Sequence, residues 1–285
     1  MKHLKQNRAA SFIAISLVYL LATAFGIFVY FATNLAWWLS LLIADVAATV
    51  LTFVFSLIFK NASVYDPYWS VQPPVILLLF AIGKKITALG ILLLLAVLFW
   101  AIRLTANWAY TFKNLNHQDW RYTMLREKTG SFYPIINFVG IHMVPTLVVY
   151  TCVLPAVYAI TEGLESKNLL SVIFILVSIG AASMQAIADI QMHSFRKCPD
   201  GTFIRRGLWK YSRHPNYLGE ILMWWGIALS VVSAAPNAWY LTMGAILNTI
   251  LFLAVSIPMA DGRQSAKPGF AEYKSHTRML LPIKK

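Results

Sequence analysis

Eight apolar runs, separated by short polar segments, divide the sequence. They cover residues 11–31, 36–59, 73–82, 87–110, 134–160, 168–195, 216–233 and 239–258. Because a helix needs about 20 apolar residues to cross a bilayer, most of these runs are long enough to be transmembrane helices. The run 73–82 is about half that length and is followed by Lys84 and Lys85. The pattern therefore predicts an all-α, polytopic transmembrane helical bundle of seven to eight spans.

The composition supports the membrane class. Of the 285 residues, 59% are hydrophobic and 12% are charged, against roughly a quarter charged in soluble domains. The run 11–31 is longer than the apolar core of a signal peptide, which has about 7–15 residues, so it is interpreted as a transmembrane helix. The two cysteines, Cys152 and Cys198, have neither disulfide-framework nor metal-site spacing, and no metal is expected.

The net charge of +13 is explained by membrane topology. If all eight runs cross, only Lys84, Lys85 and Lys167 fall on the side opposite to the other basic residues. Positive charge accumulates in cytoplasmic loops, so both ends of the chain are expected to be cytoplasmic. A re-entrant 73–82 run would change the side of every later loop. Because topology accounts for the basic residues, no nucleic-acid partner is expected.

Four acidic or strongly basic residues (Asp, Glu, Lys or Arg) lie within apolar runs: Asp45, Arg103, Asp189 and Glu220. Such groups are costly at membrane depth and usually face the interior of a bundle. For Asp45 a buried pair that holds helices together is the favoured interpretation. Arg103 shares a helix face with Asn107 one turn later, so an Arg–Asp pair across helices and a functional role both stay open.

Another helix face combines Asp189, His193 and Arg196, which are four and three residues apart. The guanidinium suits phosphate because its donors form a planar fork. The alternative is a charged helix end that contacts lipid head groups.

Two polar, aromatic-rich stretches are not explained by apolar burial. Residues 63–70 contain Tyr65, Asp66 and Trp69, and a tyrosine beside a carboxylate makes a polarised proton donor. Residues 210–220 (KYSRHPNYLGE) follow a basic loop and lead into the run 216–233. A basic surface at the start of a membrane helix indicates an anion site.

These stretches resemble the steroid 5-alpha-reductase-like superfamily of membrane proteins, and most closely its bacterial branch of unknown function. The resemblance covers the chain after about residue 60. It rests on residues 65–70 (YDPYWS), 119–122 (DWRY), 195–197 (FRK), 207–220 and 256–259 (SIPM). The pattern Arg-His-Pro-x-Tyr-x-Gly by itself is also found in isoprenylcysteine carboxyl methyltransferases and sterol reductases.

The resemblance implies two parts, with N-terminal transmembrane helices at 1–60 and a steroid 5-alpha-reductase-like transmembrane catalytic domain at 61–285. It implies an integral protein of a bacterial inner membrane that reduces the carbon–carbon double bond of a lipophilic, steroid-like enone, with a cytoplasmic site for NADPH. The cofactor contacts that it implies are Asp189, His193, Arg196, Tyr211, Arg213, His214, Asn216, Tyr217, Glu220 and, loosely matched, Arg263.

The catalytic residues that the resemblance implies depart from the family pattern. Asp66, with Tyr65, stands where 5-alpha-reductases have a glutamate and a glutamine, so steroid specificity is not implied with it. Trp100 falls near the position of the family's catalytic tyrosine. The substrate pocket is expected to contain Trp69, Trp100, Arg103 and Asn107.

Two other classes of function are compatible with parts of the sequence. An S-adenosylmethionine-dependent membrane methyltransferase would use the same Arg-His-Pro entry but would need a pair of acids after the last hairpin, where Asp261 and Glu272 are eleven residues apart. A non-catalytic lipid-binding membrane protein would keep the pocket without needing the basic loop. The expected partners are membrane lipids and a lipophilic small molecule. The sequence does not indicate an oligomeric state.

Overall fold

The computed structural model describes residues 2–166, 168–199 and 202–282, and these residues are mostly helical with no β-strand. The predicted all-α membrane class is confirmed. Seven helical stretches of the described residues are long and apolar enough to cross a membrane. They are Arg8–Ala32, Trp37–Ile58, Ala88–Thr111, Trp120–Thr161, Leu169–Lys197, Pro215–Ala234 and Pro236–Ser265.

The chain groups into two compact units, Met1–Val75 with Thr105–Tyr150 and Ile76–Leu104 with Thr151–Lys285. They are called unit 1 and unit 2 below. The division falls within the helices α4 (Tyr68–Ala81), α5 (Ala88–Thr111) and α8 (Val144–Thr161). It differs from the division predicted at residue 60, which stays a prediction.

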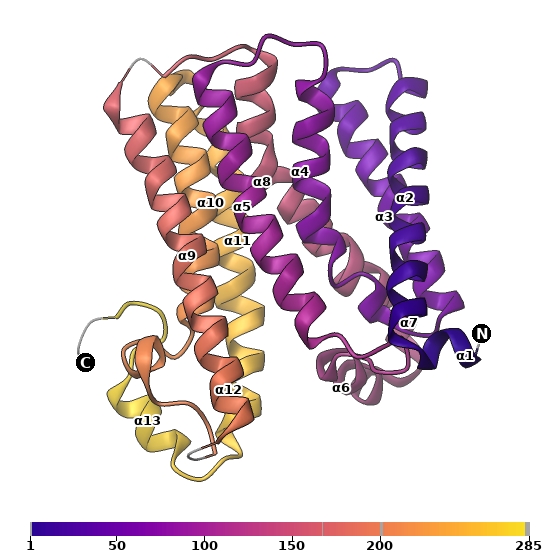
Figure 1. Ribbon diagram of the computed structural model, residues 1–285, viewed down its shortest axis with the longest axis vertical. Helices are drawn as coiled ribbons and strands as arrows, with labels where there is room; N and C mark the ends of the chain where they lie inside the picture. The colour runs from indigo at the N-terminus through magenta and orange to yellow at the C-terminus, as the bar shows by residue number, and fades with distance from the viewer. Residues whose placement is uncertain (1, 167, 200–201, 283–285) are drawn as a thin grey trace. The chain divides into compact units, whose positions relative to one another are not determined.

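Unit 1 begins with α1 and contains two of the long apolar helices (Figure 1). Besides its parts of α4, α5 and α8, its elements are α1 (Lys2–Gln6), α2 (Arg8–Ala32), α3 (Trp37–Ile58), η1 (Ala62–Val64), α6 (Trp120–Thr129), η2 (Gly130–Phe132), α7 (Tyr133–Ile136) and η3 (Asn137–Met143). The buried residues of α2 recur every three to four positions, and its other faces expose large apolar side chains such as Leu20 and Phe28. So much exposed apolar surface is typical of a helix that contacts lipid.

Unit 2 contains a pair of long helices, α9 (Leu169–Lys197) and α10 (Pro215–Ala234), which pack along each other (Figure 1). Its other elements are η4 (Gly207–Lys210), η5 (Pro236–Thr242), α11 (Met243–Leu251), η6 (Phe252–Ser256), α12 (Ile257–Ser265) and α13 (Phe270–His276). Gly219 permits the close approach, because a Cβ atom there would lie 2.7 Å from the carbonyl oxygen of Ala181. The residue after it, Glu220, is thereby held against α9.

Two π-helical segments interrupt the long apolar stretches. η3 ends at Met143, two residues before Pro145, and η6 ends at Ser256, two residues before Pro258. Proline has no backbone N–H and its ring clashes with the carbonyl four residues earlier, so the preceding turn widens instead of keeping α-helical hydrogen bonds. The run 134–160 is therefore one continuous but locally widened helical stretch.

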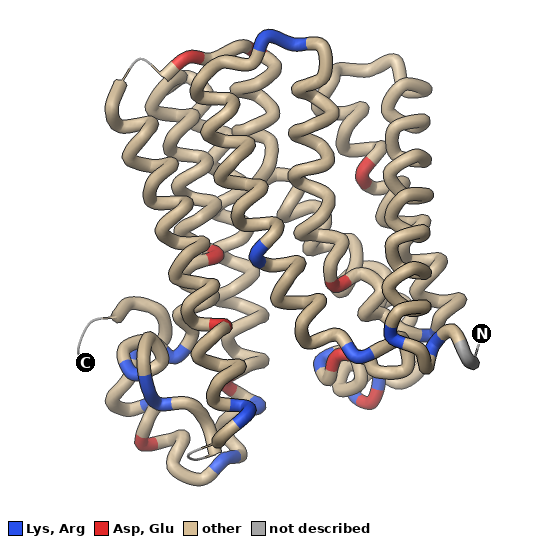
Figure 2. The backbone as a smooth tube through the Cα atoms, viewed as in Figure 1, with Lys and Arg blue, Asp and Glu red and all other residues tan. Residues whose placement is uncertain are grey.

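The short run 73–82 forms the end of α4, which has 14 residues and so a length of about 21 Å at ~1.5 Å per residue. This is shorter than the ~30 Å hydrocarbon core. A full crossing by this helix and cytoplasmic placement of both chain ends stay predictions. In unit 2, the basic loop between α4 and α5 lies at the end of the helices opposite to the larger basic group near α12 and α13 (Figure 2). Lys167, which the sequence predicts on the same side as Lys84 and Lys85, lies outside the described residues.

Candidate functional site

The predicted site residues divide between the two units. Unit 1 contains the predicted catalytic residues, Tyr65 and Asp66, together with Trp69 and Asn107. Unit 2 contains every residue that the resemblance assigns to the cofactor, and also Trp100 and Arg103. Each group is described within its own unit.

In unit 2, Arg103 on α5 is the centre of a buried polar cluster at membrane depth. Its Nη1 donates to Asp189 Oδ2 on α9 at 2.9 Å, and its Nη2 donates to Gln185 Oε1. Glu220 Oε2 on α10 is 3.8 Å from the same Nη2. This is the Arg–Asp pair across helices that the sequence left open. One cation faces two acids, in a group called the Arg103 cluster below.

Glu220 is 5% exposed, and neutral donors hold it in addition to Arg103. Trp100 Nε1 donates to its Oε2 at 2.9 Å, Trp224 Nε1 donates to its Oε1 at 2.8 Å, and Gln185 Nε2 donates to its Oε2 at 3.1 Å. Trp100, expected in a substrate pocket, is fully buried in this role. Gln185 and Trp224 were missed in the sequence, although each is four residues from a predicted acid on the same helix.

At the end of unit 2, Arg213 and His214 are bound to Asp261 of α12. Arg213 Nη2 donates to Asp261 Oδ2 at 2.9 Å, and its Nη1 donates to the carbonyl oxygen of Thr277 at 2.6 Å. His214 Nε2 lies 2.9 Å from Asp261 Oδ1, and the Tyr217 ring stacks on the imidazole with a centroid separation of 5.2 Å. The Arg-His-Pro pattern thus holds the C-terminal segment in place. This group is called the Asp261 clasp below.

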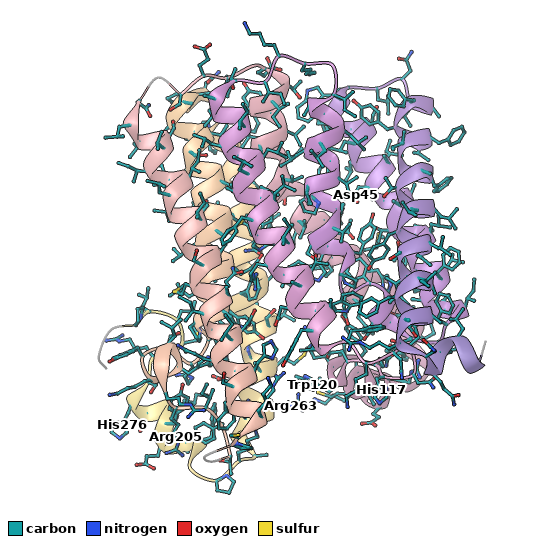
Figure 3. The ribbon with its side chains drawn as sticks, viewed as in Figure 1. Asp45, His117, Trp120, Arg205, Arg263 and His276 are labelled. Carbon is teal, nitrogen blue, oxygen red and sulfur yellow. The ribbon has the colours of Figure 1, made fainter. Side chains whose placement is uncertain are left out.

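The other predicted cofactor residues lie around the Asp261 clasp or on α9. Tyr211, Arg196 and Arg263 are exposed, and His193 is partly exposed. Asn216 has a buried Oδ1 atom for which the described residues supply no hydrogen-bond partner. Arg205, Arg263 and His276 lie at the same end of unit 2 (Figure 3). This end therefore offers exposed cations and one unused acceptor. Cofactor contacts by Arg213 and His214 stay a prediction, because their donors already have partners within the chain.

In unit 1, Tyr65 and Asp66 are neighbours in the chain but bind different partners. Tyr65 O–H and Thr146 Oγ1 are 2.8 Å apart, and Tyr122 O–H donates to Asp66 Oδ1. Tyr122 belongs to the stretch 119–122, which is one of those that carry the resemblance. Its bond to Asp66 could not be predicted from the sequence. Trp69 packs beside Tyr65, and Asn107 is partly exposed on α5.

Burial raises the pKa of Asp66 from its ordinary value of 3.8 to about 6, although Arg121 and the hydrogen bond from Tyr122 oppose the shift. Burial likewise raises the pKa of Tyr65 above its ordinary value. Asp66 is therefore the one of the two that exchanges a proton near neutral pH, as a general acid must.

The shift at Asp66 predicts a pH dependence of stability. Since the carboxyl binds its proton more tightly in the folded protein, its stabilising contribution is present below about pH 4 and is lost as the pH rises through about 6. We expect a loss of about 3 kcal/mol over this window, and Asp66→Asn should remove it. Denaturant unfolding of both proteins across the window checks this, with the exposed acid variant Glu272→Gln as control. A wild-type profile as flat as that of Asp66→Asn would contradict the prediction.

The chain is similar to a known protein family and to a known protein. The model of a family described as "Protein of unknown function (DUF1295)" matches residues 52–277. An uncharacterized protein of Schizosaccharomyces pombe is 24% identical over 253 residues, which cover 78% of this chain and 73% of that protein. No solved structure matches the chain. The described residues contain no group of three or more His, Cys, Asp and Glu side chains arranged to hold a metal ion.

Proposed function

The chain belongs to the DUF1295 family, and from that premise we propose that it is a membrane-embedded, NADPH-dependent reductase of the carbon–carbon double bond in a lipophilic enone. The observation that carries the proposal is the arrangement along α9. This helix supplies Asp189 to the Arg103 cluster and ends in exposed basic residues, all within unit 2. Ionisable groups kept at membrane depth are typical of functional sites.

The residues of unit 2 fit a dinucleotide phosphate. Arg196 is seven residues beyond Asp189 on α9, or about 10 Å along the helix axis. A long ligand with a polyanionic and a polar end matches such a spacing, with phosphate at the exposed guanidinium. The unused Oδ1 of Asn216 offers an acceptor to an amide or hydroxyl group. NADPH, when bound, supplies the hydride for the reaction.

The chemistry of an enone reduction also needs an acid. A hydride adds to the β carbon, the carbonyl oxygen takes negative charge, and a proton finally reaches the α carbon, which leaves a saturated ketone and NADP⁺. Asp66 of unit 1, half-protonated near pH 6, is the proposed donor of a hydrogen bond or proton to the carbonyl oxygen, because a donor that is present before charge develops there lowers the barrier. Tyr122, which donates a hydrogen bond to this carboxyl, is a positioning residue.

The resemblance to steroid 5-alpha-reductase-like proteins supports the same class of reaction. The hydrogen-bond partner of Tyr65 changes the role that the resemblance implies for this residue. Because Tyr65 binds Thr146 rather than Asp66, Tyr65 is the weaker of the two candidates for catalysis. A bacterial inner-membrane location with the cofactor end cytoplasmic belongs to this proposal as well.

Ligand-dependent stability tests the proposal. Purified protein in detergent is heated with NADPH, NADH, S-adenosylmethionine or no addition. A ligand at about a hundred times its Kd stabilises the folded state by roughly 2.7 kcal/mol. We expect this gain with NADPH, a loss of the gain in Arg196→Ala, and no such loss in Arg126→Ala, where the exposed arginine lies in unit 1.

Two outcomes would contradict the proposal. Stabilisation by S-adenosylmethionine instead would indicate a methyltransferase. If none of the three compounds stabilises the protein, the result would favour a non-catalytic lipid-binding membrane protein.

A further inference from the structure

Asp45 is a buried acid of unit 1 that the proposed function does not use. It lies on α3 (Trp37–Ile58), eight residues from one end of the helix and thirteen from the other. Figure 3 shows it well inside the helical layer, away from the end of unit 1 where His117 and Trp120 lie. Its side chain is 4% exposed. Asp45 is therefore an acid at membrane depth with almost no access to solvent.

The hydrogen-bond partners of Asp45 are neutral. Tyr68 O–H donates to its Oδ1 at 3.2 Å, and the Gln72 amide contacts its Oδ2 at 2.6 Å. The groups with which it interacts from neighbouring elements are also tyrosines, Tyr65 and Tyr150. No lysine, arginine or histidine is within ion-pair distance of it among the residues that the structure describes.

Glu220, the other fully enclosed acid described above, has a different set of partners. It receives three N–H donors and has the Arg103 guanidinium at 3.8 Å. Asp45 has two neutral partners and no cation. Because an isolated carboxylate in a low-dielectric interior is far more costly than a neutral acid, Asp45 favours its neutral form.

The short contact with Gln72 agrees with a neutral acid. The oxygen and nitrogen of an amide have nearly the same shape, so the Gln72 amide can present either atom to Asp45. A separation of 2.6 Å is usual for an O–H donor, whereas N–H donors are usually at about 2.9 Å. A protonated Asp45 that donates to the amide oxygen of Gln72 accounts for this distance.

A row of hydroxyl groups begins at Tyr68, which donates to Asp45 and also hydrogen-bonds the Thr49 side chain. Thr49, one turn further along α3, lies with its Oγ1 3.0 Å from Oγ1 of Thr146. The Thr146 hydroxyl in turn lies 2.8 Å from O–H of Tyr65. The His142 ring packs on Tyr65 with a centroid separation of 4.7 Å, and the described residues give its buried Nε2 no hydrogen-bond partner. Hydroxyl and imidazole groups in such a row can pass protons.

We propose that Asp45 is a proton-binding site in the membrane interior of unit 1. Its ligand is a proton, which the carboxyl holds in the resting protein and exchanges with water by way of the hydroxyl row of Thr49, Thr146 and Tyr65. Gln72 and Tyr68 hold the carboxyl in place. The proposal does not depend on the reductase activity, because it shares no residue with the nucleotide site and only Tyr65, the weaker catalytic candidate, with the proposed reductase.

Infrared spectroscopy tests the protonation state directly. A protonated carboxyl has a C=O stretching band that is separate from the bands of amides and carboxylates. The protein is reconstituted at neutral pH in vesicles of ether-linked lipid, which has no ester C=O band. An Asp66→Asn background is used, because burial also raises the pKa of Asp66. We expect one such band, its complete loss in Asp45→Asn, and its retention in Glu220→Gln. We also expect the band to shift after transfer to heavy water, as the O–H group becomes O–D.

Each contrary outcome is decisive. A band that persists in Asp45→Asn, or no band at all, would show that Asp45 is ionised and would overturn the proposal. Loss of the band on addition of sodium chloride, but not of choline chloride, would identify a cation site instead. A band that fails to move in heavy water would overturn exchange with water. If Asp45→Asn does not fold, Gln72→Leu retains the acid but should move the band to higher frequency, and an unmoved band would overturn the assignment.

Discussion

Replacement of Arg103 by leucine is expected to lower the free energy of unfolding by about 3–5 kcal/mol, the usual cost of removing one partner from a buried ion pair. Asp189 and Glu220 would both lose the guanidinium that they share. Denaturant unfolding of the purified protein measures the loss. A decrease below about 1 kcal/mol would contradict the view that the Arg103 cluster is held by charge.

Two comparisons separate charge from the mere loss of a large side chain. Arg121→Leu removes an arginine whose pair with Asp119 is much more exposed, and it should cost at most about 1 kcal/mol. In the Arg103→Leu background, a second change of Glu220 to Gln should restore part of the stability, because a neutral amide does not need the missing cation. Failure of this rescue would indicate that packing, not charge, explains the loss.

The length of the apolar runs was sufficient to predict the membrane helices, because crossing a bilayer imposes a simple length rule. The run 216–233 begins one residue after α10 begins at Pro215. Polar segments were less predictable. One of the polar segments between the apolar runs contains residues 113–130, yet α6 forms there and continues into the next membrane helix. A local signal for it existed, because Asp119 caps the helix by accepting a hydrogen bond from Arg121 N.

Local spacing predicted the residues of the site better than it predicted their partners. The acids and Arg103 stood out because charge is rare within apolar runs. The bond between Tyr122 and Asp66 joins residues 56 positions apart, and the pair of Arg213 and Asp261 spans 48 positions. Sequence periodicity identifies neighbours within one helix but not contacts between helices, so partners at this distance follow only from the packing.

Replacement of Asp261 by alanine is expected to release the C-terminal segment and to cost about 3 kcal/mol or more in unfolding free energy. Arg213 is only 7% exposed at its side chain, so without Asp261 it would be a buried cation with one carbonyl partner, at Thr277. The backbone N–H of Arg213 also donates to the carbonyl oxygen of Arg278. The segment around Arg213 and the C-terminal segment should therefore loosen together.

Limited proteolysis detects this release as faster cleavage after α13, and denaturant unfolding gives the free energy. Glu272→Ala, which removes an exposed acid of α13 outside the Asp261 clasp, should change neither. If Arg213 and His214 also contact the proposed cofactor, Asp261→Ala should reduce the stabilisation by NADPH even though Asp261 itself binds only protein groups. Unchanged cleavage of the tail would show that α13 is held by the packing of Phe270 and Tyr273 against Phe203, and not by the Asp261 clasp.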